Sequence, residues 1–306
     1  MLTFARIFLQ MNKRVGSWVI FLLLCFIWGS SFILMKYSKE GLTAVQIASV
    51  RIFFGGIVFI PFALFHFKKI PAKKTGLVIL IGIFGNLIPA FLFAFAIAKN
   101  IDSSLAGILN SLTPICVVAI SLIFFKDIIR KQKIIGVIIG FAGLCLLTFT
   151  QNNISLEHFG FSLLIVLATI FYGINVNLVS HYLQDQSPIH LATVSIALMT
   201  IPTGFVLWQQ GFLQLDFNKE IIRHSVIASV ILGIAGSSIA TTLFYVLVQK
   251  AGGLFASLVT YGIPIVAIFW GVLDGEKITI IEMGCLLIIL LGVYLANRPE
   301  KKRAGI

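Results

Sequence analysis

The stretch GIFGNLIPAFLFAFAIAKN (residues 82–100) has a counterpart later in the chain, GIAGSSIATTLFYVLVQKA (residues 233–251). The two align without a gap at an offset of 151 residues. Gly82 matches Gly233 at the start, and Lys99 matches Lys250 near the end. Because apolar segments resemble one another by chance, the match carries weight only if other segments repeat in the same order.

Three further pairs keep that order with little drift in offset: Pro114 with Pro264, Ala106 with Ala256, and Trp28-Gly29 with Tyr172-Gly173. The sequence therefore predicts an internal duplication.

The composition decides where such a chain can fold. It is 59% hydrophobic and 11% charged, with a mean hydropathy of +1.05. Soluble domains have about 25% charged residues, whereas a membrane span needs about 20 apolar residues. We expect a polytopic membrane protein. Ten apolar runs are found, at about 17–35, 43–65, 75–98, 103–125, 133–150, 158–182, 188–209, 223–248, 253–273 and 279–297.

The positive charges predict the direction of the spans. Of the 23 Lys and Arg residues, sixteen fall on one side of ten alternating spans and six on the other, and Arg51 lies within a span. The richer side faces the cytoplasm, so both termini are expected there, in a multi-pass protein of the cell (inner) membrane. The net charge of +12 is then explained by topology and not by nucleic-acid binding. The first apolar run has no small-residue cleavage site and is interpreted as an uncleaved span.

Together these patterns predict an all-α integral membrane fold of ten transmembrane helices, arranged as two inverted five-helix repeats. The repeats are 17–150 and 157–297, flanked by a cytoplasmic segment at 1–16 and a basic tail at 298–306. Five is an odd number, so the second repeat enters the membrane from the opposite side. Secondary transporters built in this way bind their substrate near the midplane, between the repeats.

Three motifs make the chain resemble the EamA-type drug/metabolite transporter superfamily. They are WGSSFILMKYS in the first span, the Arg of ASVRIFFGG (48–56) in the second, and the Pro of LNSLTPICVVAISLIFFKD in the fourth. The resemblance implies a carrier for small metabolites, often amino acids or related compounds, and more often an exporter than an importer. The second half departs from the pattern, because Tyr172 replaces Trp28 and no Arg answers Arg51.

The first spans of the two halves supply candidate substrate-binding residues. Trp28 and Ser31 share one helix face, as do Tyr172 and Asn175. We expect these faces to meet across the pseudo-two-fold axis, with aromatic walls that each offer one donor and polar groups that orient a ligand. The alternative is that the polar groups bond between helices and the aromatic rings fill space.

Arg51 lies within the second apolar run. A charge at such depth costs about 2.5–3.5 kcal/mol on insertion scales, so it must face protein, water or ligand. It either attracts a substrate anion near the outer vestibule or stabilises the fold.

Further candidates occupy the repeated third and fourth spans. They are Asn86 with its counterpart Ser237, followed by Thr241 and Tyr245, and then Asn110 and Tyr261. Pro114 and Pro264 remove the helical partners of the carbonyls of Asn110 and Thr260. These carbonyls predict either a hinge or a ligand site. The glycines at 136, 140 and 143 are interpreted as helix-packing positions.

The sequence lacks the motifs that several other functional classes require. Neither a phosphate loop nor H-E-x-x-H or G-x-S-x-G is present, so we expect no enzyme, no cofactor and no metal. No acidic residue lies deep in a span, which favours facilitated diffusion or exchange over proton coupling through a buried carboxylate. The expected partners are a small-molecule substrate and the lipid bilayer, with the chain a monomer or weak homodimer. The alternatives are an uptake permease, an integral-membrane enzyme or sensor, and a channel.

Overall fold

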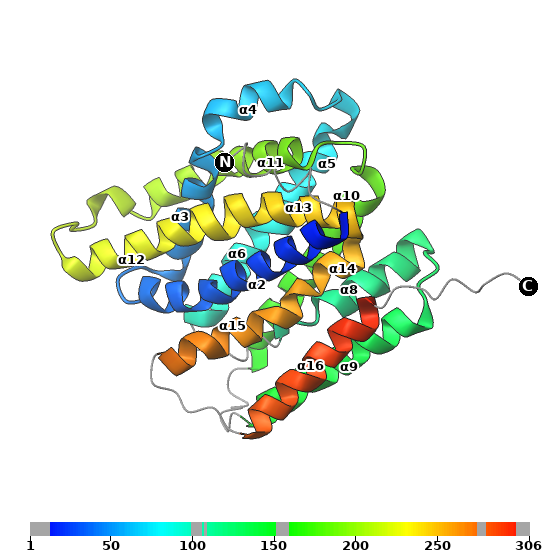
Figure 1. Ribbon diagram of the computed structural model, residues 1–306. Coiled ribbons are helices and arrows are strands. Elements are labelled where there is room, and N and C mark those ends of the chain that lie inside the picture. Colours follow the sequence, from blue (N-terminus) through cyan, green and yellow to red (C-terminus); the bar gives the residue numbers. More distant parts are fainter. Residues whose placement is uncertain (1–12, 99–105, 107–108, 151–158, 274–279, 298–306) are drawn as a thin grey trace, which may run out of the picture.

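The structure is a computed structural model that describes residues 13–98, 106, 109–150, 159–273 and 280–297. Every regular element in these ranges is helical (Figure 1). The first half contains α2 (Lys13–Ser38), α3 (Ala44–Ile57), α4 (Ile60–Phe67), α5 (Ala72–Gly82), η1 (Ile83–Leu87), α6 (Ile88–Ala98), α8 (Thr113–Ile120), η2 (Ser121–Phe125) and α9 (Lys131–Thr150). The second contains α10 (Phe159–Tyr182), α11 (Pro188–Gln209), η4 (Phe212–Gln214), α12 (Glu220–Ile231), η5 (Leu232–Ile239), α13 (Ala240–Ala251), α14 (Gly253–Ser257), α15 (Val259–Leu273) and α16 (Ile280–Asn297).

Within the described ranges, five continuous helical runs are long and apolar enough to cross a membrane: Val15–Ser38, Ala72–Ala98, Leu163–Tyr182, Pro188–Gln209 and Glu220–Ala251. A sixth candidate is the pair α3 and α4, if the two count as one span. The all-helical membrane class predicted from the sequence is thus confirmed.

The second apolar run, predicted as a span at about 43–65, is broken into two helices in the structure. The helix stops at Ile57, and α4 leaves at an angle of 64°. Pro61 lies in the first turn of α4, and a proline cannot donate the hydrogen bond that would continue α3. The 14 residues of α3 extend about 21 Å at 1.5 Å per residue. That is less than the ~30 Å hydrocarbon core of a bilayer, so α3 alone is too short to count as a span.

The two halves pack in a related way. α2 lies against α15, and its counterpart α10 lies against α8. Each contact is made at a glycine: a Cβ on Gly29 would come within 2.5 Å of Val266, and one on Gly173 within 3.0 Å of Cys116. These matched glycines therefore admit a neighbouring helix in each half. Small residues permit such close contact between helices in membranes.

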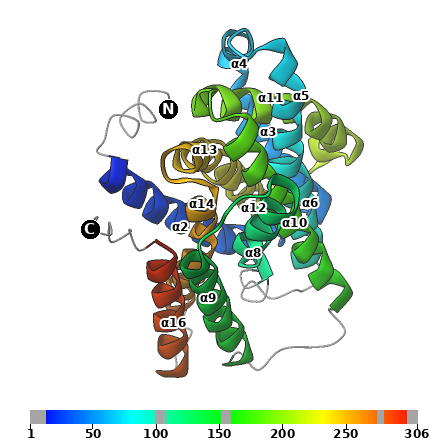
Figure 2. The same cartoon turned by 90° about the vertical axis from the view of Figure 1, so that its right-hand side faces the viewer.

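The last helices of the two halves, α9 and α16, run side by side and lie to one side of the other helices (Figures 1 and 2). A Cβ on Gly136 would meet Ala296, and one on Gly140 would meet Tyr261 of α15. A Cβ on Gly292 would come within 2.3 Å of the backbone nitrogen of Gly140. The interpretation of the fifth-span glycines as packing positions is confirmed.

The two repeated stretches, residues 82–100 and 233–251, each contain a segment that departs from α-helical geometry. η1 and η5 are π-helical turns, which occur mostly at functional sites. Pro89 lies just beyond η1, and η5 contains Gly233, Gly236 and two serines. The two turns occupy matched positions in the two halves, and both contribute residues to the lining of one cavity.

Candidate functional site: a central cavity between the halves

A cavity of about 850 Å³, its open mouth included, lies among the helices of both halves. Of the eleven residues predicted from the sequence to bind substrate, nine line it: Trp28, Ser31, Arg51, Asn86, Asn110, Tyr172, Asn175, Thr241 and Tyr245. They come from helices far apart in the sequence, so the fold brings the predicted set to one place.

Arg51 is the one charged residue among those that line the cavity in the described part of the chain. Its Nε donates a hydrogen bond to Oγ of Ser237, at 3.1 Å. α3 reaches η5 closely at this level, because a Cβ on Gly233 would come within 2.3 Å of the Arg51 carbonyl oxygen. One edge of the guanidinium is thereby fixed. Its two Nη groups have no hydrogen-bond partner among the described residues.

Two further hydrogen-bonded pairs border the same cavity, and one of them joins the halves. Thr241 donates its hydroxyl to Oδ1 of Asn86 at 3.0 Å. Tyr245, one turn further along α13, donates to Oδ1 of Asn175 at 3.3 Å within the second half. Ser237 and Thr241 are four residues apart, which places neighbours on one helix face about one turn apart. Arg51 and Asn86 are therefore bound by adjacent turns of η5 and α13, and both residues line the cavity.

Two residues that line the cavity each have a buried amide atom without a hydrogen-bond partner in the described residues: Nδ2 of Asn86, a donor, and Oδ1 of Asn110, an acceptor. The residues are 6% and 8% exposed. Leaving such a group unsatisfied costs about 1–3 kcal/mol. Both residues line the cavity, so a bound solute is able to supply the missing partners.

The aromatic residues that line the cavity include pairs whose positions are related by the internal repeat. Trp28 lies against Phe244, with ring centroids 5.3 Å apart, and Tyr172 lies against Phe93 at 6.3 Å. Phe93 and Phe244 are one of the matched pairs of the two repeated stretches. Phe244 was not predicted to line the cavity, although its match with Phe93 was a signal that pointed to it.

Some predicted donors are already engaged. The indole Nε1 of Trp28 donates to the carbonyl of Gly236 in η5 at 2.9 Å, so the expectation that Trp28 offers its donor to a ligand is wrong. The Ser31 hydroxyl donates to the Ile27 carbonyl of its own helix at 3.1 Å. In contrast, the Tyr172 hydroxyl has no hydrogen-bond partner among the described residues.

Two predicted residues do not line the cavity. Ser237 is fully buried behind Arg51 and acts on the site through that side chain. Tyr261 was expected to reach the cavity, and this is wrong: its hydroxyl donates to the Val137 carbonyl of α9 at 2.8 Å. The ring turns that way because Gly140 leaves room for it.

The two proline-freed carbonyls are not left open. The Asn110 carbonyl accepts a hydrogen bond from Thr113 Oγ1 at 2.6 Å. The Thr260 carbonyl accepts one from Ser111 Oγ at 3.1 Å, which joins the fourth span of the first half to its counterpart. Pro114 lies in the first turn of α8, and Pro264 lies inside α15. Hydroxyl groups thus replace the lost helical partners beside the cavity.

Helical elements that are bent or broken around a central cavity are typical of multi-pass membrane proteins of the transporter type. The EamA-like transporter family model matches residues 16–149 and 160–298. The chain belongs to that family, and it contains two copies of the family's repeat.

The chain is similar to an uncharacterized transporter of Archaeoglobus fulgidus, with 28% identity over 93% of this chain and 99% of the relative. It is 25% identical to the uncharacterized inner membrane transporter YedA of Escherichia coli, over 89% and 87% of the two chains. Protein PagO of Salmonella typhimurium is 23% identical over 95% and 97%. A solved structure described as a crystal structure of protein matches with a TM-score of 0.70 at 16% identity, covering 92% of this chain and 98% of that one. It supports the fold alone.

Proposed function

We propose that the protein is a carrier that moves a small zwitterionic metabolite, with an amino acid as the best candidate, across the cell membrane by alternating access. The halves are two inverted five-span repeats, with both termini in the cytoplasm, and the direction is export. The observation that carries the proposal is the single cavity charge, Arg51, whose Nη groups have no partner among the described residues.

The chemistry of the cavity selects the solute class. A guanidinium binds a carboxylate through paired N–H donors, and Nδ2 of Asn86 offers another donor on the adjacent turn. No acidic residue lines the cavity in the described part of the chain. A solute ammonium group has the acceptor Oδ1 of Asn110, but a solute whose only charge is positive meets an unbalanced Arg51.

The remaining wall is apolar. Phe32, Met35, Phe93 and Ile263 belong to one packed cluster that borders the cavity. An amphipathic solute fits this division, with its charged groups toward Arg51 and its apolar part toward the cluster. Apolar walls with a few polar groups among them are typical of sites that bind small molecules.

The test is counterflow in proteoliposomes that contain the purified protein. The liposomes are loaded with unlabelled solute, and the uptake of labelled solute is followed for amino acids, amines, nucleosides and organic anions. We expect transient accumulation of one or more amino acids. A folded protein that accumulates none of the panel contradicts the proposal, and accumulation of amines alone contradicts the role given to Arg51. The alternative within the same class is an uptake permease for a metabolite.

A further inference from the structure

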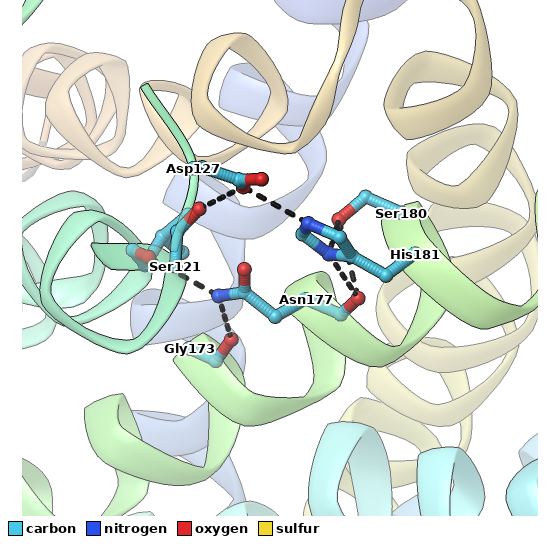
Figure 3. A network of polar contacts seen from close by, with 7 residues as sticks. Ser121, Asp127, Gly173, Asn177, Ser180 and His181 are labelled. Atoms are coloured by element: carbon cyan, nitrogen blue, oxygen red, sulfur yellow. Dashed lines mark hydrogen bonds and ion pairs between the residues drawn. The ribbon is translucent and has the colours of Figure 1, made fainter. Parts of the chain in front are cut away.

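A second polar cluster lies at the ends of α8/η2 and α10 (Figure 3). Lys126 ends the π-helical turn η2 with a left-handed backbone, φ 54°. The next residue, Asp127, meets His181, which is the penultimate residue of α10. The two are 54 residues apart in the sequence, which is why the pattern of the spans gave no sign of the pair.

The imidazole of His181 is held on three sides. Its Nε2 lies 2.9 Å from Oδ2 of Asp127, and Ser121 Oγ donates to the same carboxylate oxygen. The Phe125 ring stacks on the imidazole, with centroids 3.9 Å apart and an angle of 21°. The His181 side chain remains 26% exposed, so water has access to it.

Both ring nitrogens face acceptors. Nδ1 lies 2.9 Å from the backbone carbonyl of Asn177, and Nε2 faces a carboxylate. A neutral imidazole has one N–H and satisfies only one of them, whereas an imidazolium has two and satisfies both. Ser180 Oγ lies 3.3 Å from the same Nδ1, so its hydroxyl is placed to donate to Nδ1 when the ring is neutral.

We infer that His181 is a proton-binding site, with water as the source and acceptor of the proton, and that proton occupancy holds the end of the fourth span against the end of the sixth. With the proton bound, Nδ1–H donates to the Asn177 carbonyl and the ring is paired with Asp127 as an ion. Without it, Ser180 donates to Nδ1 and the ion pair is lost. Histidine exchanges a proton within the physiological pH range.

The site is connected to the cavity through the same two helices. Nδ2 of Asn177 donates to the Val117 carbonyl of α8 at 3.1 Å and to the Gly173 carbonyl at 2.9 Å. Four residues before Val117, Thr113 lines the cavity, and on α10 Asn175 does so. The proton site therefore restrains the end of a segment whose other end, near Pro114, forms part of the cavity wall.

The other charged groups near this end of α10 do not compete for the role. Lys74 of α5 donates to the Tyr182 carbonyl at 3.0 Å and pairs with Asp185. The hydrogen bond from Lys74 holds the pKa of the Asp185 carboxyl below its usual range, so that pair stays ionised between pH 6 and 8.

The elements that pack against α10 add few titratable groups. α13 carries Tyr245 and Lys250, and α8 carries Cys116, while α6, α14 and η1 carry none. Lys126 is adjacent to Asp127 and is exposed. Both ring nitrogens of His181 face acceptors, so the geometry points to His181 as the proton-binding group of the cluster.

The direct test measures the distance between the two helix ends. Spin labels are placed at exposed positions 128 and 184 of the full chain, after replacement of the four native cysteines. We expect a narrow distance distribution at pH 6 and a broad one at pH 8. His181→Gln should remove the pH response, and Ser180→Ala should move it to higher pH, because the neutral ring loses its donor. A wild-type distribution that does not change with pH overturns the inference.

The matched control is His224→Gln. His224 is an exposed histidine whose Nε2 lies 3.8 Å from Glu220, four residues earlier in α12, and its replacement should leave the response intact. If it abolishes the response as His181→Gln does, the assignment to His181 is wrong.

A transport measurement extends the test and rests on the proposed function. Exchange in proteoliposomes at equal pH on both sides should rise at least threefold from pH 6 to pH 8, and this ratio should fall to about one in His181→Gln. An equal ratio in both proteins overturns the link between the proton site and transport. If no solute is exchanged at all but the spin-label distances respond as expected, the proton site stands and the proposed function fails.

Discussion

Arg51 in α3 is held by a residue of the opposite half: its Nε donates a hydrogen bond to Oγ of Ser237, 186 residues later in the chain, at 3.1 Å. Ser237 is the repeat counterpart of Asn86, and Asn86 accepts a hydrogen bond from Thr241 on the adjacent turn. Ser237 thus holds the charged side chain of Arg51, and its repeat counterpart Asn86 supplies the unpaired donor Nδ2. The substrate proposal depends on this arrangement.

Replacing Arg51 by Gln should weaken binding of carboxylate-bearing solutes by about ten- to a hundredfold. A hydrogen bond to a charged group contributes about 1.5–3 kcal/mol, and each 1.4 kcal/mol is a factor of ten. Counterflow competition with zwitterionic and cationic solutes measures the effect, and Arg51→Lys, which keeps the charge, should lose less. An equal loss for solutes of every charge would show that Arg51 is structural.

Replacing Asn110 by Leu should separate stability from binding. Oδ1 of Asn110 is buried without a partner among the described residues, so removing it relieves an uncompensated polar group. We expect the thermal unfolding midpoint of the empty protein in detergent to stay the same or rise. Solute affinity should fall about tenfold, because one hydrogen bond to the ligand is lost. A lower midpoint with unchanged affinity would assign Asn110 to the fold and not to the site.

Two glycine substitutions should have opposite effects on stability. A Cβ on Gly140 would come within 2.4 Å of the Tyr261 ring, whereas a Cβ on Gly284 meets nothing within 4 Å. Overpacking costs about 1–3 kcal/mol, so Gly140→Ala should lower the thermal midpoint. Gly284→Ala should raise it slightly, because alanine is favoured over glycine by about 0.5–1 kcal/mol in a helix. Equal shifts in both variants would argue against the close contact of α9 with its neighbours.

The sequence predicted the helical membrane class and most of the cavity, because helix periodicity and the repeat both act on residues in fixed register. It did not predict the bend at α3 and α4 or the three π-helical turns of the described residues. In each case the backbone geometry depends on local hydrogen bonds that the apolar pattern does not encode. The side chains of Trp28 and Tyr261 were assigned wrongly for a similar reason. Their partners, the carbonyls of Gly236 and Val137, are backbone groups on distant helices.

The proximity of Asp127 and His181 also lay beyond sequence reasoning, since the two residues belong to different halves and lie at helix ends. The sequence argued against proton coupling because no acidic residue lies deep in a span. That argument concerns carboxylates deep within the spans, and it does not apply to a titratable group at the end of a span. The structure brings such a group to the joint between α10 and the end of η2.

The most direct test of the central claim is protection of the cavity by its solute. Cysteine is introduced at Asn175, which lines the cavity, and at Thr203, which is fully buried outside it. The native cysteines are replaced, and the rate of reaction with a small polar thiol reagent is measured with and without the solute identified by counterflow. We expect Cys at 175 to react and Cys at 203 not to, and saturating solute to slow the reaction at 175 at least fivefold. Protection should disappear when Arg51 is also replaced by Gln. Reaction at 175 that the transported solute does not slow would contradict a binding site in this cavity.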